Sequence, residues 1–144
     1  MRGLVAIAAL GLAVGTSASA ATGPEAVVEA FHAALAKGDT AGAAALLADD
    51  ALIFEEGHAE RSKAEYAARH LPADAEFAKA VRTTMTRRAS RSVGGVAWVA
   101  SEGRLNGTFR GRAIDRMSTE TMILQRTNRG WKIRHVHWSS SAAP

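Results

Sequence analysis

Apolar residues near the start of the chain recur at the three- and four-residue spacing of one face of an α-helix. Val27, Phe31 and Leu35 share that face, and the following Lys37-Gly38 is a typical helix stop signal. The alanine-rich stretch 40–50 predicts a second helix that runs to its acidic end. The pattern therefore predicts a helical hairpin.

A short strand and a third helix are predicted next. Residues 51–61, "ALIFEEGHAER", combine a strand-like apolar run with a turn at Gly57. The segment 62–65, "SKAE", has the spacing of a capping box, which indicates the start of a helix. Tyr66 and His70 then lie one helical turn apart. One more short helical segment follows before the pattern changes.

From residue 81 onward, runs rich in β-branched and aromatic residues alternate with turn residues, which is typical of antiparallel strands. The predicted turns are Gly94-Gly95, Asn106-Gly107 and Asn128-Arg129-Gly130. Helices followed by such a meander predict an α+β domain. We expect the N-terminal helices to pack on a strongly curved, mostly antiparallel sheet that forms a cone with a central pocket.

The first residues carry a different pattern. Residues 1–21 contain one arginine, an apolar run and small residues that end in Ala-Ser-Ala, which predicts a cleavable signal peptide with cleavage near Ala20 or Ala21. The apolar run is shorter than the roughly 20 residues that a bilayer-spanning helix needs. We therefore expect a periplasmic or secreted protein with no membrane insertion after cleavage. The predicted domain covers 22–140, and 141–144 form a disordered tail.

Composition narrows the functional classes. The chain has no cysteine, which excludes disulfides and thiolate chemistry. Its 18 lysines and arginines exceed its 14 aspartates and glutamates only mildly. The arginine clusters are not interleaved with aromatic residues and accompany no nucleic-acid motif, so no nucleic acid is expected as a partner.

Two long stretches resemble a known family. "AVVEAFHAALAKGDTAGAAALLADDALIFEEG" resembles the opening helical hairpin and first strand of the SnoaL-like family, and "STETMILQRTNRGWKIRHVHWSS" resembles its closing hairpin. This family belongs to the nuclear-transport-factor-2-like superfamily, whose members share a cystatin-like, ketosteroid-isomerase-like cone. The resemblance covers about residues 24 to 140 and implies a pocket between sheet and helices.

The resemblance implies several functions rather than one. Together with the export predicted from residues 1–21, it implies an exported protein that binds a small-molecule ligand, or a cofactor-free lyase, isomerase or hydrolase with Glu120 or His137 as base. A non-catalytic association domain, with its pocket filled by its own side chains, is a further alternative. A ketosteroid isomerase mechanism is not supported, because Tyr66 is the single tyrosine and no aspartate aligns with the base. Relatives often pair through the convex side of the sheet, which implies a homodimer with Trp138 on that outer face.

The closing hairpin concentrates the candidate chemistry in "WKIRHVHW". With a turn at Asn128-Arg129, uninterrupted pairing places Met122 opposite His135 and Glu120 opposite His137 on the concave face. A slip of one residue would send both histidines to the outside. The expected pocket lining is Glu120, His135, His137, His70, Trp98, Tyr66 and Met122.

Three interpretations of this lining remain open. The histidines are polar pocket lining, or a Glu120–His137 pair performs acid–base chemistry. Neither interpretation requires a cofactor. In the third, a periplasmic copper or zinc site forms from His135 and His137 with His70 and His58. The remaining histidine, His32, is expected at the surface of the first helix rather than in a site.

Overall fold

The computed structural model describes residues 23–144, and the predicted signal peptide lies outside the described residues. The helices are α1 (Pro24–Lys37), α2 (Thr40–Leu46), α3 (Lys63–Arg69) and α4 (Leu71–Ala80). The strands are β1 (Leu47–Glu55), β2 (His58–Glu60), β3 (Val81–Val93), β4 (Val96–Phe109), β5 (Arg112–Thr127) and β6 (Gly130–Ala142). Within 23–144, no helix is both long enough and apolar enough to cross a membrane.

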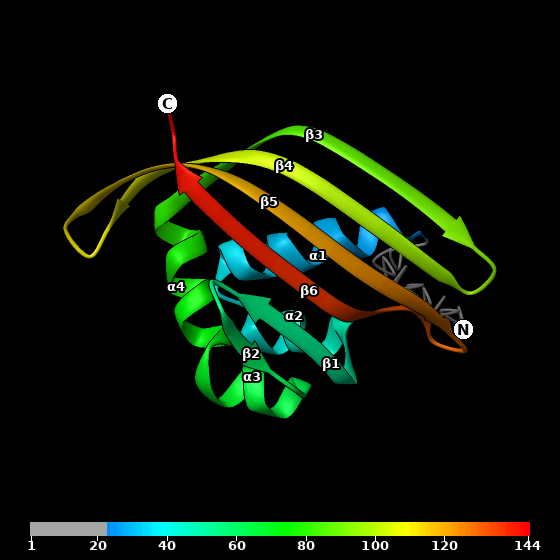
Figure 1. Cartoon of the computed structure of the whole chain (residues 1–144). Coiled ribbons are helices and arrows are strands. Elements are labelled where there is room, and N and C mark those ends of the chain that lie inside the picture. Colours follow the sequence, from blue (N-terminus) through cyan, green and yellow to red (C-terminus); the bar gives the residue numbers. More distant parts are fainter. Residues whose placement is uncertain (1–22) are drawn as a thin grey trace, which may run out of the picture.

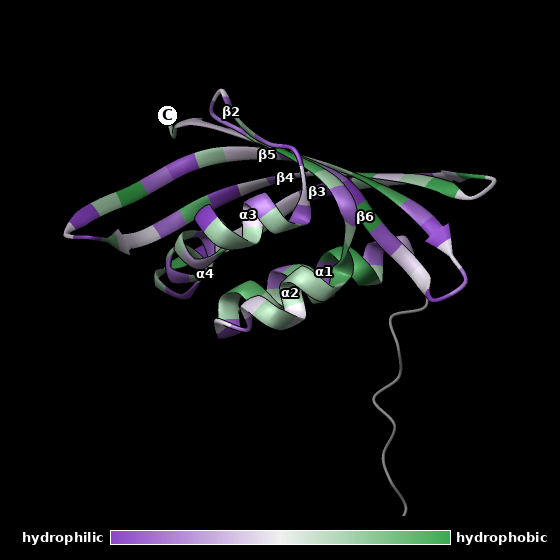
Figure 2. Cartoon of the chain, turned by 90° about the horizontal axis from the view of Figure 1, so that it is seen from below, coloured by the Kyte–Doolittle hydropathy of each residue, from purple (hydrophilic) through white to green (hydrophobic). Residues whose placement is uncertain are grey.

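The strands form one curved sheet in the order β2-β1-β6-β5-β4-β3. All neighbours pair antiparallel except β1 and β6, which are parallel. The long strands arch over the helices (Figure 1), and the helices lie on one side of the sheet (Figure 2). This arrangement confirms the predicted α+β cone.

The core lies between α1 and the inner face of the sheet. Phe31 and Val28 of α1 are fully buried, as are Met122, Ile133 and Val136 of β5 and β6. Burying a side chain of this size stabilises the fold by about 1.5–3 kcal/mol. The apolar face predicted for the first helix is thus the face that α1 buries. Met122 was predicted to line the pocket, but it belongs to the core.

The predicted signals for the helix ends hold in most cases. Gly38 ends α1 with a left-handed backbone, φ +73°, and its N–H reaches the last carbonyls of the helix. Ser62 caps α3 by accepting a hydrogen bond from the N–H of Glu65. The second helix, however, ends at Leu46 rather than at residue 50. Leu47 pairs with Ile133 of β6 and is buried, so tertiary pairing outweighs the helical propensity of this segment.

Asn106-Gly107 was predicted as a turn and is instead part of β4. That strand continues to Phe109, and the turn falls at Arg110-Gly111, where both residues have positive φ. Gly107 has a different role, because a Cβ there would lie 2.6 Å from the carbonyl oxygen of Ala80. The glycine therefore allows the junction between α4 and β3 to pass close to β4.

The closing hairpin begins in the predicted register and then departs from it. Leu124 lies opposite Ile133 as expected, but the next pair is Ile123 and His135, so Arg134 is an extra residue on β6. Such a β-bulge shifts every later pair by one residue. The β6 side chains that follow the bulge therefore lie on the opposite faces of the sheet from those predicted, whereas the β5 side chains keep theirs.

The C-terminal end of the domain also extends further than predicted. Strand β6 runs to Ala142, which pairs with Arg116. The N–H of Ala143 donates a hydrogen bond to the carbonyl of Asp115 at 3.1 Å. The tail predicted at 141–144 is therefore largely paired with β5, because backbone hydrogen bonds are available along the whole neighbouring strand.

Candidate functional site

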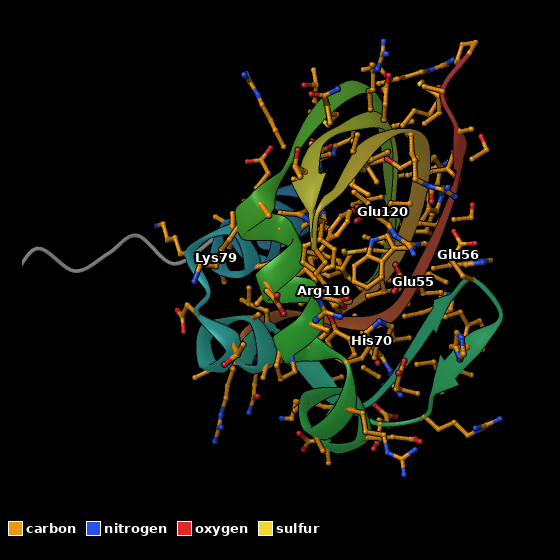
Figure 3. The ribbon with its side chains drawn as sticks, turned by 90° about the vertical axis from the view of Figure 1, so that its left-hand side faces the viewer. Glu55, Glu56, His70, Lys79, Arg110 and Glu120 are labelled. Carbon is orange, nitrogen blue, oxygen red and sulfur yellow. The ribbon has the colours of Figure 1, made fainter. Side chains whose placement is uncertain are left out.

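A cavity of about 800 Å³ lies between the helices and the concave face of the sheet. Its apolar lining includes Leu35 and Phe77 from the helices and Leu105 from β4. Two groups of polar side chains border it. In Figure 3, Glu120 lies toward one part of this space, and Glu55 and His70 lie toward another. The mixture of apolar walls and a few polar groups is typical of small-molecule sites.

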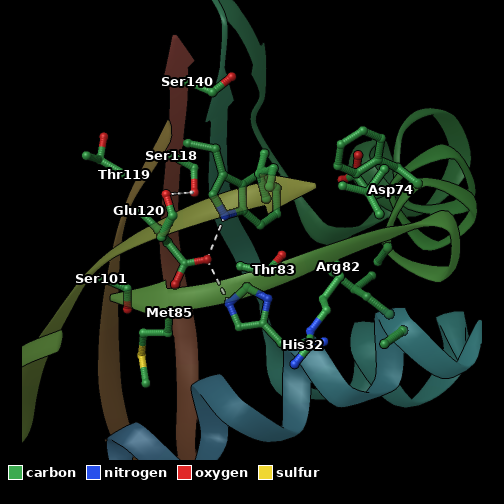
Figure 4. A pocket seen from close by; sticks show the side chains of 18 of the residues that line it. His32, Asp74, Arg82, Thr83, Met85, Ser101, Ser118, Thr119, Glu120 and Ser140 are labelled. Carbon is green, nitrogen blue, oxygen red and sulfur yellow. Dashed lines mark hydrogen bonds and ion pairs between the residues drawn. The ribbon is translucent and has the colours of Figure 1, made fainter. Parts of the chain in front are cut away.

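Glu120 is the polar centre of the first group. It projects inward from β5 and is only 8 % exposed. Its Oε2 accepts a hydrogen bond from the indole Nε1 of Trp138 at 2.7 Å and lies 2.8 Å from Nε2 of His32 (Figure 4). Its other oxygen, Oε1, is buried and has no hydrogen-bond partner in residues 23–144. One carboxylate oxygen is therefore held in place, and the other is left without a hydrogen-bond partner in a residue that lines the cavity.

The environment of Glu120 keeps it ionised. Burial raises the pKa of this carboxyl, but the hydrogen bond and charge of His32 and the hydrogen bond from Trp138 outweigh burial. The pKa is therefore lowered below the ordinary value of 4.5. Glu120 is an anion at neutral pH, stabilised on one side only.

Packing of α1 against β6 brings the partners of Glu120 together. Phe31 stacks on Trp138 with ring centroids 6.3 Å apart, and the neighbouring His32 contacts Glu120. The predictions that His32 lies outside the site and that Trp138 packs on the outer face are therefore wrong. The bulge at Arg134 places Trp138 opposite Glu120 across the ladder, where His137 was expected.

The second polar group surrounds His70, at the junction of α3 and α4. Its Nε2 lies 3.1 Å from Oε2 of Glu55 and 3.4 Å from Oδ1 of Asp74. Its Nδ1 lies 3.1 Å from Oε1 of Glu60. Tyr66, fully buried, donates its hydroxyl proton to Oδ2 of Asp74 at 2.5 Å. Glu55 and Asp74 also line the cavity, so this group borders the same space as Glu120.

Burial and mutual repulsion shift the pKa values in this group. Burial, followed by the charge of Asp74, raises the pKa of Glu55 to about 7. Burial also raises the pKa of Asp74, and burial followed by the charge of Asp74 raises that of Tyr66. Burial lowers the pKa of His70, but the surrounding carboxylates outweigh it, so the net pKa is raised. The group therefore retains protons more strongly than isolated side chains would.

The structure separates several residues that were predicted to share the pocket. His135 and His137 pair with Ile123 and Thr121 and lie on the outer face, because of the bulge. Both rings contact Phe54 there. Trp98 is 41 % exposed in the same row as Ile123, so it neither lines the pocket nor joins the core.

The predicted copper or zinc set is not assembled. His135 and His137 lie on the opposite face of the sheet from His70, and His58 is exposed on β2. A different group within residues 23–144 has the arrangement of metal ligands: Glu55, His70 and Asp74, whose candidate ligand atoms all lie within 4.8 Å of one another. A sequence signal for this group existed in the i, i+4 spacing of His70 and Asp74.

Comparison with known proteins gives consistent results. The model of the SnoaL-like domain matches residues 25–144. A candidate ketosteroid isomerase from Shewanella frigidimarina is 38 % identical, with a TM-score of 0.75, covering 78 % of this chain and 91 % of that one. A candidate NTF2-like dehydratase from Streptomyces avermitilis is 19 % identical, with a TM-score of 0.69 and coverages of 81 % and 92 %, and shares the fold. A comparison with curated proteins found no match.

The ionised state of Glu120 predicts a specific pH dependence. Because its folded-state pKa lies below the ordinary value of 4.5, the unfolded chain binds the proton more readily. Glu120 therefore contributes stability above that pH, and the contribution is lost as the pH falls through the folded-state pKa. We expect Glu120→Gln to be less stable than the wild type at neutral pH, with a difference that shrinks on acidification.

Urea unfolding followed by circular dichroism between about pH 7 and pH 3 measures this difference. Glu102→Gln, which removes an exposed carboxylate on the adjacent strand, serves as the matched control and should follow the wild type. Parallel stability curves for wild type and Glu120→Gln over the whole range would contradict the assignment.

Proposed function

The chain belongs to the SnoaL-like domain family, and we propose that its cavity binds a small organic molecule with an apolar body and a hydrogen-bond donor. The observation that carries the proposal is the buried, unpartnered Oε1 of Glu120 beside the cavity. A buried acceptor without a partner costs about 1–3 kcal/mol, and more when it is charged. A donor on the ligand would remove that cost and fix the ligand's orientation.

The open cavity favours this function over a pure association domain. For an association domain we expected the pocket to be filled by its own side chains. The space of about 800 Å³ is instead within the range of small-molecule sites. Its apolar walls would cover the body of the ligand, and Glu120 would accept from its polar end.

The binding proposal predicts a difference between two closely matched probes. We expect 2-naphthol, a planar phenol, to bind and to donate its hydroxyl proton to Glu120. Glu120→Ala should weaken this binding by about 10- to 100-fold, the range for a hydrogen bond to a charged group. Isothermal titration calorimetry of wild type and variant gives both dissociation constants.

The second probe, 2-methoxynaphthalene, has the same body without a donor. It should bind wild type and Glu120→Ala with similar affinity. Glu76→Gln, which removes an exposed carboxylate outside the cavity lining, should bind both probes as the wild type does. Equal losses for the two probes in Glu120→Ala would contradict the hydrogen bond, and no binding of either probe would contradict the assigned ligand class.

The same carboxylate supports a proposal of cofactor-free isomerase chemistry. Glu120 is ionised and its Oε1 is free, whereas His32 and Trp138 stabilise Oε2. Such a base can remove a proton from the carbon between a carbonyl and a double bond and return it to the far alkene carbon, with no net loss of atoms. His137, the other base considered from the sequence, lies on the outer face and has no part in this proposal.

This chemistry predicts activity on a simple β,γ-unsaturated ketone. We expect the wild type to convert 3-cyclohexenone into its conjugated isomer, which is followed by ultraviolet absorbance. Glu120→Gln should lower the rate by about 10²- to 10⁴-fold, the usual contribution of a general base. Glu76→Gln, outside the cavity lining, should retain the wild-type rate. A wild-type rate no greater than that in buffer would contradict isomerase activity and leave the binding proposal to its own test.

A homodimer through the outer face of the sheet completes the proposal. One row across four strands carries Leu52, His135, Ile123 and Trp98, and the apolar members are 39–41 % exposed. Phe54, 37 % exposed, extends this apolar surface in the next row. Contiguous exposed apolar surface of this kind marks protein interfaces, and two copies of one face satisfy two-fold symmetry.

The dimer proposal predicts that a charge in this row separates the subunits. Ile123→Glu should shift the sedimentation coefficient from that of a dimer to that of a monomer at micromolar concentration. Met85→Glu, which places the same charge at a half-exposed position lining the cavity, should remain dimeric. A wild type that sediments as a monomer, or a dimeric Ile123→Glu, would contradict this interface.

A further inference from the structure

We propose that Glu55, His70 and Asp74 bind a divalent transition-metal ion at the margin of the cavity. Binding of the ion does not depend on Glu120, and only its use as a Lewis acid rests on the small-molecule function proposed above. Nε2 of His70 lies 3.1 Å from Oε2 of Glu55 and 3.4 Å from Oδ1 of Asp74. Ligands about 2.0–2.2 Å from a tetrahedral metal lie roughly 3.3–3.6 Å apart, so small side-chain movements bring this set to metal-binding geometry.

The three ligands come from firmly placed positions of the backbone. His70 lies between α3 and α4, and Asp74 follows it by four residues on α4, so both point to the same side. Glu55 is the last residue of β1, which is held between β2 and β6. A site built on helices and strands holds its ligands more exactly than one built on loops.

His70 and Asp74 each have a second partner that orients the side chain. Glu60 lies 3.1 Å from Nδ1 of His70, which favours the tautomer with its proton on Nδ1 and the lone pair on Nε2. Tyr66 holds Oδ2 of Asp74 and leaves Oδ1 toward His70. A carboxylate behind a ligating imidazole and a hydrogen bond behind a ligating carboxylate are the usual supports of metal ligands.

The negative charge of the cluster supports a bound cation independently of the spacing of the ligand atoms. Glu55, Glu60 and Asp74 can carry three negative charges, and no lysine or arginine of residues 23–144 forms an ion pair with any of them. Glu60 is only 8 % exposed, and its Oε2 is buried without a hydrogen-bond partner beside the oxygen that contacts His70. A divalent cation would balance this charge, including that of the Glu60 carboxylate whose Oε2 has no partner.

The ligand types identify the class of metal. One imidazole and two carboxylates suit Zn²⁺ or Mn²⁺, whereas Mg²⁺ prefers oxygen ligands and keeps its water. Because Glu55 and Asp74 line the cavity, the remaining coordination positions of the ion would face the space that holds the small molecule. The ion would then present a Lewis acid to an oxygen atom of that molecule.

Zinc titration of the purified protein by isothermal calorimetry tests the site directly. We expect one Zn²⁺ per chain with a dissociation constant below about 10 μM, weaker binding of Mn²⁺, and no binding of Mg²⁺ at that concentration. Asp74→Asn and His70→Ala should each abolish it. Replacing both outer-face histidines, His135→Ala with His137→Ala, is the matched control and should retain it.

Three further variants separate a metal site from a merely structural cluster. Glu60→Gln keeps the shape of the side chain and should weaken Zn²⁺ binding by about 10- to 100-fold, the usual effect of losing an orienting partner. Circular dichroism confirms that each variant is folded, and Glu55→Gln provides a partly exposed ligand if His70→Ala does not fold. Glu120→Gln should bind Zn²⁺ as the wild type does, so failure of the small-molecule proposal leaves this one testable.

The proposal is overturned by either of two results. One is the absence of Zn²⁺ binding tighter than about 10 μM to the folded wild type, which would identify the cluster as a proton-sharing network only. The other is binding that persists in folded Asp74→Asn and Glu55→Gln but disappears in the outer-face double variant, which would assign the zinc to the His-x-His pair.

Discussion

The extra residue in β6, Arg134, is the constraint on which the candidate site depends. It separates the pair Leu124–Ile133 from the pair Ile123–His135, so that all later side chains of β6 change faces relative to an uninterrupted ladder. Trp138 thereby reaches Glu120 on the concave side, whereas His135 and His137 point away from the cavity. Without the bulge, the buried carboxylate of Glu120 would lose the indole that donates to it.

Helix α1 supplies the other half of that interaction. Its apolar face anchors it against the sheet through Phe31, and the same contact brings Phe31 against Trp138 and His32 against Glu120. Two residues next to each other in sequence thus serve the core and the cavity. The anion at Glu120 is stable only because packing brings together side chains more than 80 residues apart.

The sequence was sufficient for the features that depend on local chemistry. The apolar face of α1, the stop at Gly38, the Ser62 cap and the Asn128-Arg129 turn all follow from spacing and residue type. The predictions that were wrong concern features that depend on distant parts of the chain. The early end of α2 follows from pairing of Leu47 with β6, and the strand at Gly107 from the close approach of Ala80. The bulge at Arg134 has no glycine or other residue signature, so alternation alone assigned the histidines to the wrong face.

The two polar groups that border the cavity show that buried carboxylates can have opposite pKa shifts. Glu120 is more deeply buried than Glu55, yet its pKa is lowered, because His32 and Trp138 donate to it. The pKa of Glu55 is raised, because the charge of Asp74 adds to burial and a single imidazole is shared among three carboxylates. On one side of the cavity, His32 and Trp138 compensate the charge of Glu120 and its Oε1 has no partner, which suits a neutral hydrogen-bond donor. The other side has an excess of negative charge, suited to a cation. The same fold can hold both because the helices and the sheet both contribute side chains to each group.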